Sequence, residues 1–422
     1  MKKLTGMTLV ETRLAVIMLV PALLIVFAII IFPVLANFWI AFKPVGLGDL
    51  RRAAPQIRER VTTEAQQPGD ELVIEYRVRN TSQQVEITDV ELVLNIPAGL
   101  TVEESPGRCA TTNGRMVCSY DRWEGGYADR FEVTYIAAEP FFSQGRVPDD
   151  PTRPTATATA PNPLTNFVFT LDNFRTVFDA RQFWPSVWVT IVYTLASTLG
   201  VLVLGLFAAE LMNRSFKGKA IMRGMILFPY VAPVIAVAFT WQFFLDPFSG
   251  TLNALLQQAG IISDPIPFLS ERMYEFTPLG VPVRIPLALT SIVSFGAWRY
   301  FPFAFLFILS RLQAIDDQLY ESADLDGASP FQQFWHITIP QLWSVLSTLF
   351  LLRFMWTFNK FDDVFLLTGG AAGTKTLPIL VYDNAFGRSD IGAGAATSVV
   401  LFFFLAIFLS IYFTTIEKED QE

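Results

Sequence analysis

Charged residues are scarce in this chain of 422 residues, since Asp, Glu, Lys and Arg together make up only 17%. Hydrophobic residues make up 52% and the mean hydropathy is +0.40. This composition excludes an ordinary soluble domain and indicates a membrane protein. The charges sum to −8 with a pI near 5.0, which argues against nucleic acid as a partner.

Histidine and cysteine are scarcer still, with one His and two Cys. Without a catalytic constellation or a metal-ligand spacing, we expect no catalytic residue and no metal site. The cysteines, Cys109 and Cys118, lie in the one long polar region and fit a disulfide if that region is outside the cytoplasm; two free thiols are the alternative. Asn113-Gly114 between them is a strong hairpin-turn signal, which would place the cysteines opposite one another.

Long apolar runs are what the chain has in abundance. A helix needs about 20 apolar residues to cross the hydrocarbon core. Six runs meet this length, so the sequence predicts an all-α polytopic membrane protein with six transmembrane helices. The runs are Leu14–Ala36, Ser186–Met212, Met222–Leu245, Leu287–Leu309, Leu342–Leu367 and Ala395–Phe413.

Basic residues orient these spans. By the positive-inside bias, the N-terminus and the loop after the second span are cytoplasmic, and six spans return the C-terminus to that side. The first span is long for a signal peptide and lacks a clear cleavage site, so we expect it to be retained. The basic residues are Lys2, Lys3, Arg13, Arg214, Lys217, Lys219 and Arg223.

A polar insertion separates the first two spans. Three segments in it alternate apolar and polar residues, with Gly, Asn and Pro clusters between them, which predicts an inserted, extracytoplasmic, immunoglobulin-like β-sandwich. Pro148–Pro163 reads as an extended linker. The expected organisation is residues 1–41 (N-terminus and first span), 42–165 (insertion and linker) and 166–422 (five-helix core). The inward-facing residues are Leu72, Ile74, Tyr76 and Val78, then Leu92, Leu94 and Ile96, then Phe131, Val133 and Tyr135.

A polar segment, residues 312–340, lies between the fourth and fifth spans on the expected cytoplasmic side. Asp316 or Asp317 can cap a short helix, Gly327 can end it in the left-handed conformation, and Ser329 with Pro330 can begin a second helix. Pro340 is expected to stop that helix. The second helix carries aromatics suited to a groove on a protein partner, and the acidic residues of the first argue against DNA. The alternative is a loop that packs on its own chain.

The stretch "ESADLDGASPFQQFWHITIP" resembles the EAA loop of bacterial ABC importer permeases. The matching residues are Glu321, Ala323, Asp326, Gly327, Ala328, Phe334, Ile337 and Pro340. "FNKFDDVFLLTGG" and "TLPILVYDNAF" are similar to the carbohydrate permeases of the maltose and glycerol-phosphate type. The resemblance covers the first span and about residues 166–415, not the insertion.

This resemblance implies a multi-pass transport subunit of a bacterial or archaeal cytoplasmic membrane, not an enzyme. It implies a second permease, two ATPase subunits that bind ATP and Mg, and an extracytoplasmic solute-binding protein, with no cofactor on this chain. The EAA loop would couple to the ATPase through Glu321, Ala323, Asp326, Gly327, Ala328, Phe331, Phe334, Trp335 and Pro340. The single histidine, His336, lies in this segment and is interpreted as an interface residue rather than a general base.

Polar and aromatic residues within the fourth and fifth spans are candidates for the substrate path, because polar groups inside spans are costly and so mark function. Rings stack on sugar C–H faces, and amides and carboxylates bind hydroxyls. The alternatives are a packing ion pair (Lys360–Asp363 or Arg299–Asp362), an importer of amino acids or a phosphodiester, whose cationic clamp could use only Arg299, Arg353 and Lys360, or a non-transporting membrane sensor. The candidates are Asn359, which matches a substrate-contacting position of the family, with Phe358, Phe361, Asp363, Trp298 and Tyr300.

Overall fold

A computed structural model describes residues 9–50, 52–83, 85–142, 151–276 and 282–419. The chain divides into two compact units: one runs to Asn173 and includes Ala385–Ala395, and the other comprises Phe174–Asn384 with Ala396–Glu422. Lys2 and Lys3, which carry part of the predicted orientation, lie outside the described residues, as does the side chain of Arg13.

The first unit begins with one long helix that contains the predicted first span and extends beyond it. It consists of α1 (Leu9–Val26), a π turn (Phe27–Ile31) and α2 (Phe32–Ala41). The π turn ends two residues before Pro33. A proline lacks the N–H for the helical hydrogen bond and clashes with the preceding turn, and a widened turn relieves that clash without ending the helix.

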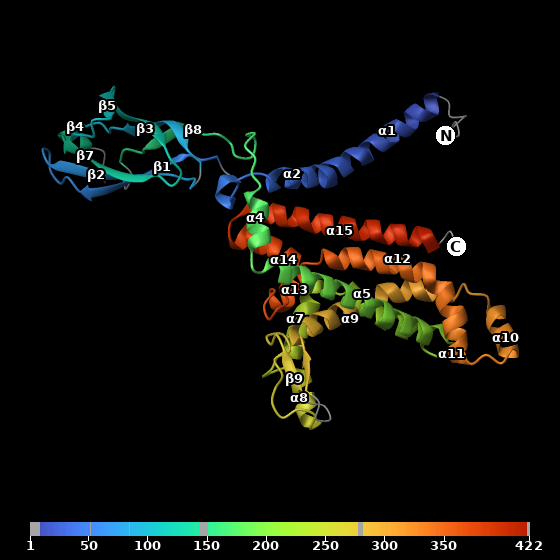
Figure 1. Cartoon of the computed structure of the whole chain (residues 1–422). Helices are drawn as coiled ribbons and strands as arrows, with labels where there is room; N and C mark the ends of the chain where they lie inside the picture. Colours follow the sequence, from blue (N-terminus) through green and yellow to red (C-terminus); the bar gives the residue numbers. More distant parts are fainter. Residues whose placement is uncertain (1–8, 51, 84, 143–150, 277–281, 420–422) are drawn as a thin grey trace. The chain divides into compact units, whose positions relative to one another are not determined.

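A β-sandwich follows, as the alternating pattern predicted (Figure 1). One sheet has the order β1-β2-β7-β4 and the other β5-β6-β3-β8, and the described pairings are antiparallel. The inward-facing residues form its core: Leu72, Ile74, Leu92, Leu94, Val133 and Tyr135 are fully buried. The strands are β1 (Pro55–Thr63), β2 (Glu71–Asn80), β3 (Ile87–Asn95), β4 (Leu100–Glu104), β5 (Cys109–Thr112), β6 (Arg115–Trp123), β7 (Ala128–Ala137) and β8 (Thr155–Thr159), with short helices η2 (Leu47–Leu50) and α3 (Glu139–Phe142).

The prediction of a plain linker over Pro148–Pro163 is wrong for its described part. Thr155–Thr159 is an edge strand, β8, paired with β3. Thr152 is buried, and its hydroxyl lies 2.9 Å from the Tyr76 hydroxyl. The alternation of Thr and Ala has the period of a strand, and threonine favours strands, whereas the proline content suggested a linker. Residues 148–150 lie outside the described residues.

The two ends of the insertion are fastened together by buried polar contacts. Lys43 is fully buried, and its ammonium group donates to the carbonyls of Asn166 and Val168 and lies 4.1 Å from the Phe169 ring centre. The Asn173 amide donates to the carbonyl oxygens of Ala41 and Lys43 at 2.8 and 2.7 Å. These bonds satisfy groups that would be costly to bury unpaired, and they fix where the insertion leaves and rejoins the helical chain.

The cysteines lie on a hairpin. Asn113 and Gly114 both have positive φ (51° and 73°), as a two-residue type I′ turn requires, and Cys109 is paired with Cys118 in register. The two sulfur atoms are bonded in the structure.

We expect Cys109→Ala with Cys118→Ala to lower the free energy of unfolding of the sandwich by roughly 2–3 kcal/mol, because the loop-closure constraint on the unfolded chain is lost. The measurement is urea unfolding of the full-length protein, followed by the fluorescence of buried Trp123. The same proteins with Trp123→Phe added give the background fluorescence of the other tryptophans. Labelling of both cysteines by a thiol reagent in the native, unreduced protein would show that the disulfide does not form.

The second unit contains the helical core (Figure 1). Among the described residues of the whole chain, five helices are long and apolar enough to cross a bilayer, or six if a bent pair counts as one. The elements that follow the sandwich in the chain, a few of whose residues belong to the first unit, are α4 (Asp172–Asp179), α5 (Phe183–Asn213), α6 (Lys219–Val231), α7 (Val234–Leu245), α8 (Thr251–Gln258), β9 (Tyr274–Phe276), β10 (Val283–Ile285), α9 (Leu287–Leu312), α10 (Asp317–Leu325), α11 (Pro330–Gln333), a π turn (Phe334–Thr338), α12 (Ile339–Phe358), α13 (Asp362–Thr368), α14 (Leu377–Tyr382), a π turn (Asp383–Gly387) and α15 (Ile391–Glu419).

Two predicted spans differ from the structure. Met222–Leu245 is not one straight helix, because α6 and α7 meet at Pro233 with a bend of 94°. Leu342–Leu367 is interrupted, since α12 ends at Phe358 and α13 begins at Asp362. A proline interrupts a helix because it lacks the N–H for the helical hydrogen bond, and the backbone groups at such a break must find other partners. The apolar composition of a segment does not show where such breaks occur.

Helices α5 and α9 pack closely through small residues. A Cβ atom at Gly200 or Gly205 would lie 2.8 Å from the Cβ of Ala297 or Ala304 on α9. In a membrane, such small residues let helix backbones approach and gain van der Waals contact. This pair of helices is the frame on which the candidate sites lie.

Candidate functional site

The polar segment forms a helix–turn–helix at the end of α9. Asp316 caps α10, since its carboxylate accepts the Gln318 N–H at 3.0 Å. Gly327 has φ +77°; its N–H donates to the Asp324 carbonyl, and the Ala328 N–H donates to the Ala323 carbonyl. These two bonds are those of a Schellman motif, which needs a left-handed residue at Gly327.

The second helix of the segment begins with a capping box. The Gln332 N–H donates to the Ser329 hydroxyl at 3.4 Å, and the Ser329 N–H donates to the Gln332 side chain at 2.8 Å. Pro330 occupies the first turn, where its missing N–H costs nothing. The predicted caps and turn are therefore as the structure has them.

The predicted stop at Pro340 is wrong. The helix runs without interruption from Pro330 through a π turn (Phe334–Thr338) to Phe358, so α11 is the first turn of a 29-residue helix. As at Pro33, the π turn ends two residues before the proline and accommodates it. Any force on α11 therefore acts on α12 directly, without a hinge at Pro340.

Side-chain hydrogen bonds brace the turn. The Gln333 amide donates to the Asp324 carboxylate at 2.5 Å, and the hydroxyls of Tyr320 and Thr338 lie 2.9 Å apart. The Arg311 guanidinium donates twice to Gln341, to its backbone and its side chain, both at 3.1 Å. The contacts fix the angle between α10 and α11 and join α9 to α12.

The outer surface of this turn is apolar and exposed. Leu325 is 90% exposed, Phe331 73% and Trp335 51%, so the described part of the chain leaves at least half of each side chain open. We call these three residues the apolar tip; they lie at the α10–α11 end of the second unit (Figure 1). Large exposed side chains of this kind, gathered at one turn, mark an interaction site rather than a core. The sequence indicated the aromatics but not Leu325, because helix periodicity alone does not tell which apolar side chain lacks a neighbour.

The other EAA residues have distinct positions. Glu321 and Asp326 are exposed, Ala323 and Ala328 are half-buried in the Schellman turn, and Phe334 is half-buried. The His336 ring nitrogen Nδ1 lies 2.9 Å from the Gln332 carbonyl oxygen.

A second candidate site is a buried cluster of charges around Tyr300 on α9. The Tyr300 hydroxyl donates to Asp363 at 3.2 Å. Three cations lie close to its ring: Arg353 at 4.2 Å, Lys360 at 5.1 Å and Arg299 at 5.5 Å from the ring centre. Cations on aromatic faces are attracted by the ring quadrupole, most strongly where water is excluded.

The cluster is largely withdrawn from solvent. Asp363 is fully buried, Arg353 4% exposed and Arg299 6% exposed. The second carboxylate oxygen of Asp363 and one or more guanidinium nitrogens of each arginine have no hydrogen-bond partner among the described residues. Buried charges are retained when they pair or act, so this cluster is a functional candidate as well as a structural one.

The alternative interpretation, a packing ion pair Lys360–Asp363 or Arg299–Asp362, holds for an ion pair of Lys360 but not for either named pairing. Lys360 pairs with Asp362 at 3.0 Å, and Arg299 donates to the Ala232 carbonyl at 3.1 Å. Ala232 lies at the bend between α6 and α7, so Arg299 satisfies a carbonyl that the bend leaves free. Both arrangements follow from the interruptions of the two spans, which the sequence did not reveal.

The structure brings only some of the predicted substrate-path residues close to one another. Asn359 is exposed and caps the end of α12, with its amide donating to the Met355 carbonyl at 3.1 Å. Phe358 is buried, and Phe361 stacks on Phe365 at 4.8 Å. Trp298 lies 5.5 Å from Trp241 and lines an apolar pocket of about 690 Å³ beside the α6–α7 bend. Asn359, Lys360 and Asp362 thus lie where α12 ends and α13 begins, not within one continuous helix.

Comparison with known proteins covers the helical core. Residues 201–418 match the family model described as "Binding-protein-dependent transport system inner membrane component". The chain is 36% identical over 242 residues to the inner membrane ABC transporter permease protein YcjO of Escherichia coli, covering 57% of this chain and 77% of that protein. It is 34% identical over 243 residues to the trehalose/maltose transport system permease protein MalF of Thermococcus litoralis, with the same coverage.

A solved structure has a similar fold. A chain from a bacterial ABC transporter involved in the import of the acidic polysaccharide alginate matches with a TM-score of 0.52 and 20% identity, covering 61% of this chain and 85% of that one. At this identity the likeness concerns the fold alone. The family match spans more than half of the chain and includes the polar segment, α12 and the Tyr300 cluster. The chain therefore belongs to the family of binding-protein-dependent transport system inner membrane components.

Proposed function

We propose that this chain is the transmembrane permease subunit of an ATP-driven importer of sugars or oligosaccharides. The observation that carries the proposal is the apolar tip: Leu325, Phe331 and Trp335 are held by a braced turn and are largely exposed in the described chain. A surface of this kind requires a partner. The sugar is suggested by relatives whose names include trehalose and maltose transport.

In this proposal the apolar tip docks in a cleft of a cytoplasmic ATPase subunit, which holds ATP and Mg; this chain binds neither. Closure of two ATPase subunits pulls α10 and α11, and the continuous helix from Pro330 to Phe358 transmits the movement into the membrane. A second permease completes the pathway, and an extracytoplasmic solute-binding protein delivers the solute.

The same proposal sets the orientation. The two chain ends and the polar segment lie in the cytoplasm, and the β-sandwich lies outside the cytoplasmic membrane of a bacterium or archaeon. The Cys109–Cys118 disulfide supports that side for the sandwich, because disulfides persist in oxidising compartments.

For the substrate path, we propose Asn359, Phe361 and Trp298 as contacts to sugar, with Phe358, Tyr300 and Asp363 supporting them from the buried side. A second candidate is a solute that carries an anionic group. It is favoured by the three cations, Arg299, Arg353 and Lys360, which the structure brings to one ring.

The test is site-specific crosslinking in cells that express the complete transporter. A photoreactive amino acid at Leu325 is expected to crosslink to an ATPase subunit, because this side chain projects from the turn with 90% of its surface free. A matched control carries the same group at Leu255 on α8, which is 54% exposed. The α8 and α10 regions are joined through α9, a helix about 39 Å long, and so lie at its opposite ends.

We expect ATPase adducts at Leu325 only. Adducts at both positions, or at Leu255 alone, would contradict the proposed docking of the apolar tip.

A further inference from the structure

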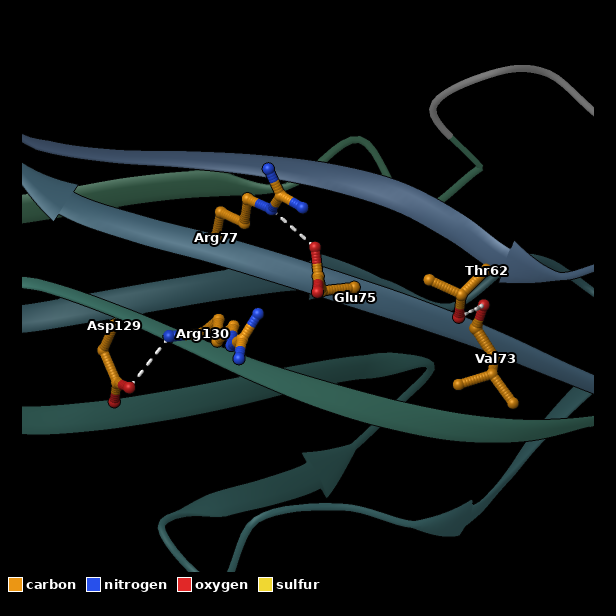
Figure 2. Close-up of polar contacts among 6 residues, drawn as sticks. All are labelled: Thr62, Val73, Glu75, Arg77, Asp129 and Arg130. Atoms are coloured by element: carbon orange, nitrogen blue, oxygen red, sulfur yellow. Dashed lines mark hydrogen bonds and ion pairs between the residues drawn. The ribbon is translucent and has the colours of Figure 1, made fainter.

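The outer face of the sheet β1-β2-β7-β4 carries a row of arginines. Arg58 on β1 lies directly opposite Arg77 on β2, and Arg77 lies directly opposite Arg130 on β7. The next row on the same face places Gln56 opposite Arg79. All four arginines are exposed. We call Arg58, Arg77, Arg79 and Arg130 the arginine row; Figure 2 shows Arg77 and Arg130 on their neighbouring strands.

This arrangement is unfavourable for the sheet alone, because like charges directly opposite on neighbouring strands repel. Arg77 is partly compensated by Glu75 at 2.5 Å, and Arg79 donates to the Gln56 side chain at 2.7 Å. The guanidinium groups of Arg58 and Arg130 have no hydrogen bond or ion pair within the described residues. The row thus concentrates positive charge, with Glu75 and Glu132 in the next row of the same face, in a chain whose net charge is −8.

The arginines line a groove of about 660 Å³ together with Gln56. That volume is within the range of small-molecule sites, roughly 300–1,000 Å³. One carboxylate, Asp129, also lines it, but its oxygens accept from the Arg130 N–H at 2.8 Å and the Tyr127 hydroxyl at 3.2 Å. The groove therefore keeps free guanidinium donors, which suit the two oxygens of a carboxylate.

The lining of the groove indicates which class of ligand it can bind. Among the described residues no aromatic side chain lines it, so a neutral sugar would lack a stacking surface there. Its described apolar lining consists of Val78, which is buried, and Ala128, and these are not the large apolar anchors typical of protein interfaces. Arginines on three adjacent strands recur at about the strand spacing of 4.8 Å, which suits a chain with regularly repeated charges.

We propose that the arginine row binds a carboxylate-bearing oligosaccharide, with one carboxylate on each of Arg58 and Arg130 and hydroxyls on Gln56. The choice of a carbohydrate rests on the proposed function, whereas the polyanion chemistry rests on the groove itself. The site belongs to the sandwich and lies outside the helical core that matches the permease family.

The test uses the full chain in nanodiscs of neutral lipid, with fluorescence anisotropy of a labelled oligogalacturonate. We expect binding that weakens as salt rises, since exposed charges are screened. Arg58→Gln and Arg130→Gln should each weaken binding roughly five- to tenfold, and the double variant more. Arg122→Gln, an exposed arginine on β6 of the other sheet, is the matched control and should bind like the unaltered protein.

Competitors identify the ligand class. Unlabelled oligogalacturonate should displace the probe, while a neutral malto-oligosaccharide of equal length should not. Stronger displacement by tripolyphosphate, or by vesicles of anionic lipid, would overturn the proposal in favour of a phosphate chain or a membrane surface. Equal binding by the Arg58→Gln/Arg130→Gln and Arg122→Gln proteins would also overturn it, and would leave the permease assignment intact. Binding as expected without an ATPase adduct at Leu325 would instead refute the proposed function and leave this site standing.

Discussion

Asp363→Ala is expected to lower the free energy of unfolding by about 3–5 kcal/mol, the range for removing one partner from a buried charge network. Asp363 is fully buried and accepts from the Tyr300 hydroxyl at 3.2 Å. Arg353 and Lys360 lie against the same ring. Without the carboxylate, the buried Arg353 and the half-buried Lys360 keep their charges among apolar helices with less compensation.

The measurement is thermal unfolding of the purified full-length protein in detergent, followed by tryptophan fluorescence. Tyr300→Phe is the matched control: it removes only the hydroxyl donor and should cost about 1 kcal/mol. Asp363→Asn keeps a carbonyl acceptor and should fall between the two. If Asp363→Ala unfolds like the unaltered protein, the cluster does not stabilise the core.

Gly327→Val is expected to uncouple the transporter while leaving the helices folded. Gly327 has φ +77°, and a left-handed conformation costs a residue with a Cβ about 1–2 kcal/mol. Apart from its two chain neighbours, no described residue has an atom within 4 Å of a Cβ placed there, so the effect comes from the backbone and not from a clash. A change of this size shifts the population of the docked geometry by roughly five- to thirtyfold.

Gly327→Asn is the matched control, which distinguishes the effect of the left-handed backbone from the effect of adding any side chain at this position. Asparagine adopts the left-handed region more readily than valine, so this variant should retain most ATPase binding. The readout is copurification of the ATPase with each variant, alongside the thermal midpoint of the permease alone. Equal ATPase recovery with Val and Asn would mean that the angle set by Gly327 does not matter for docking.

Local chemistry explains which parts of the polar segment could be predicted. The Asp316 cap, the Schellman turn at Gly327 and the Ser329–Gln332 capping box each depend on residues within one turn of each other. The same holds for Asn113-Gly114, whose turn places the cysteines in register. Features of this kind can be predicted from the sequence, because every residue that forms them lies within a few positions of the others.

Pro340 was misread as a stop and Pro233 as part of one straight span, because the effect of a proline depends on the surrounding helix. Pro33 and Pro340 follow π turns that absorb the missing N–H, so neither ends a helix. Pro233, by contrast, lies at a 94° bend whose free carbonyl is satisfied by Arg299 from α9. Whether a partner is available is a tertiary property, which the spacing of prolines does not encode.

Two further sites required the fold. Arg299 is next to Tyr300 in the sequence, but Arg353 and Lys360 are far from it, and only the packing of α9 against α12 and α13 brings them to the Tyr300 ring. The arginine row appears only once β1, β2 and β7 are paired, because a shift of one residue would turn those side chains to the core. Both depend on contacts between elements rather than on any local motif.

Reconstitution of the complete transporter in proteoliposomes tests most directly the claim that the polar segment transmits ATP hydrolysis to the pathway. Sugar uptake and sugar-stimulated ATP hydrolysis are measured together, with the unaltered chain, Gly327→Val and Gly327→Asn. We predict that uptake and stimulated hydrolysis both fall with Gly327→Val and are largely kept with Gly327→Asn. Unchanged uptake and hydrolysis with Gly327→Val, in protein of normal thermal stability, would contradict the account.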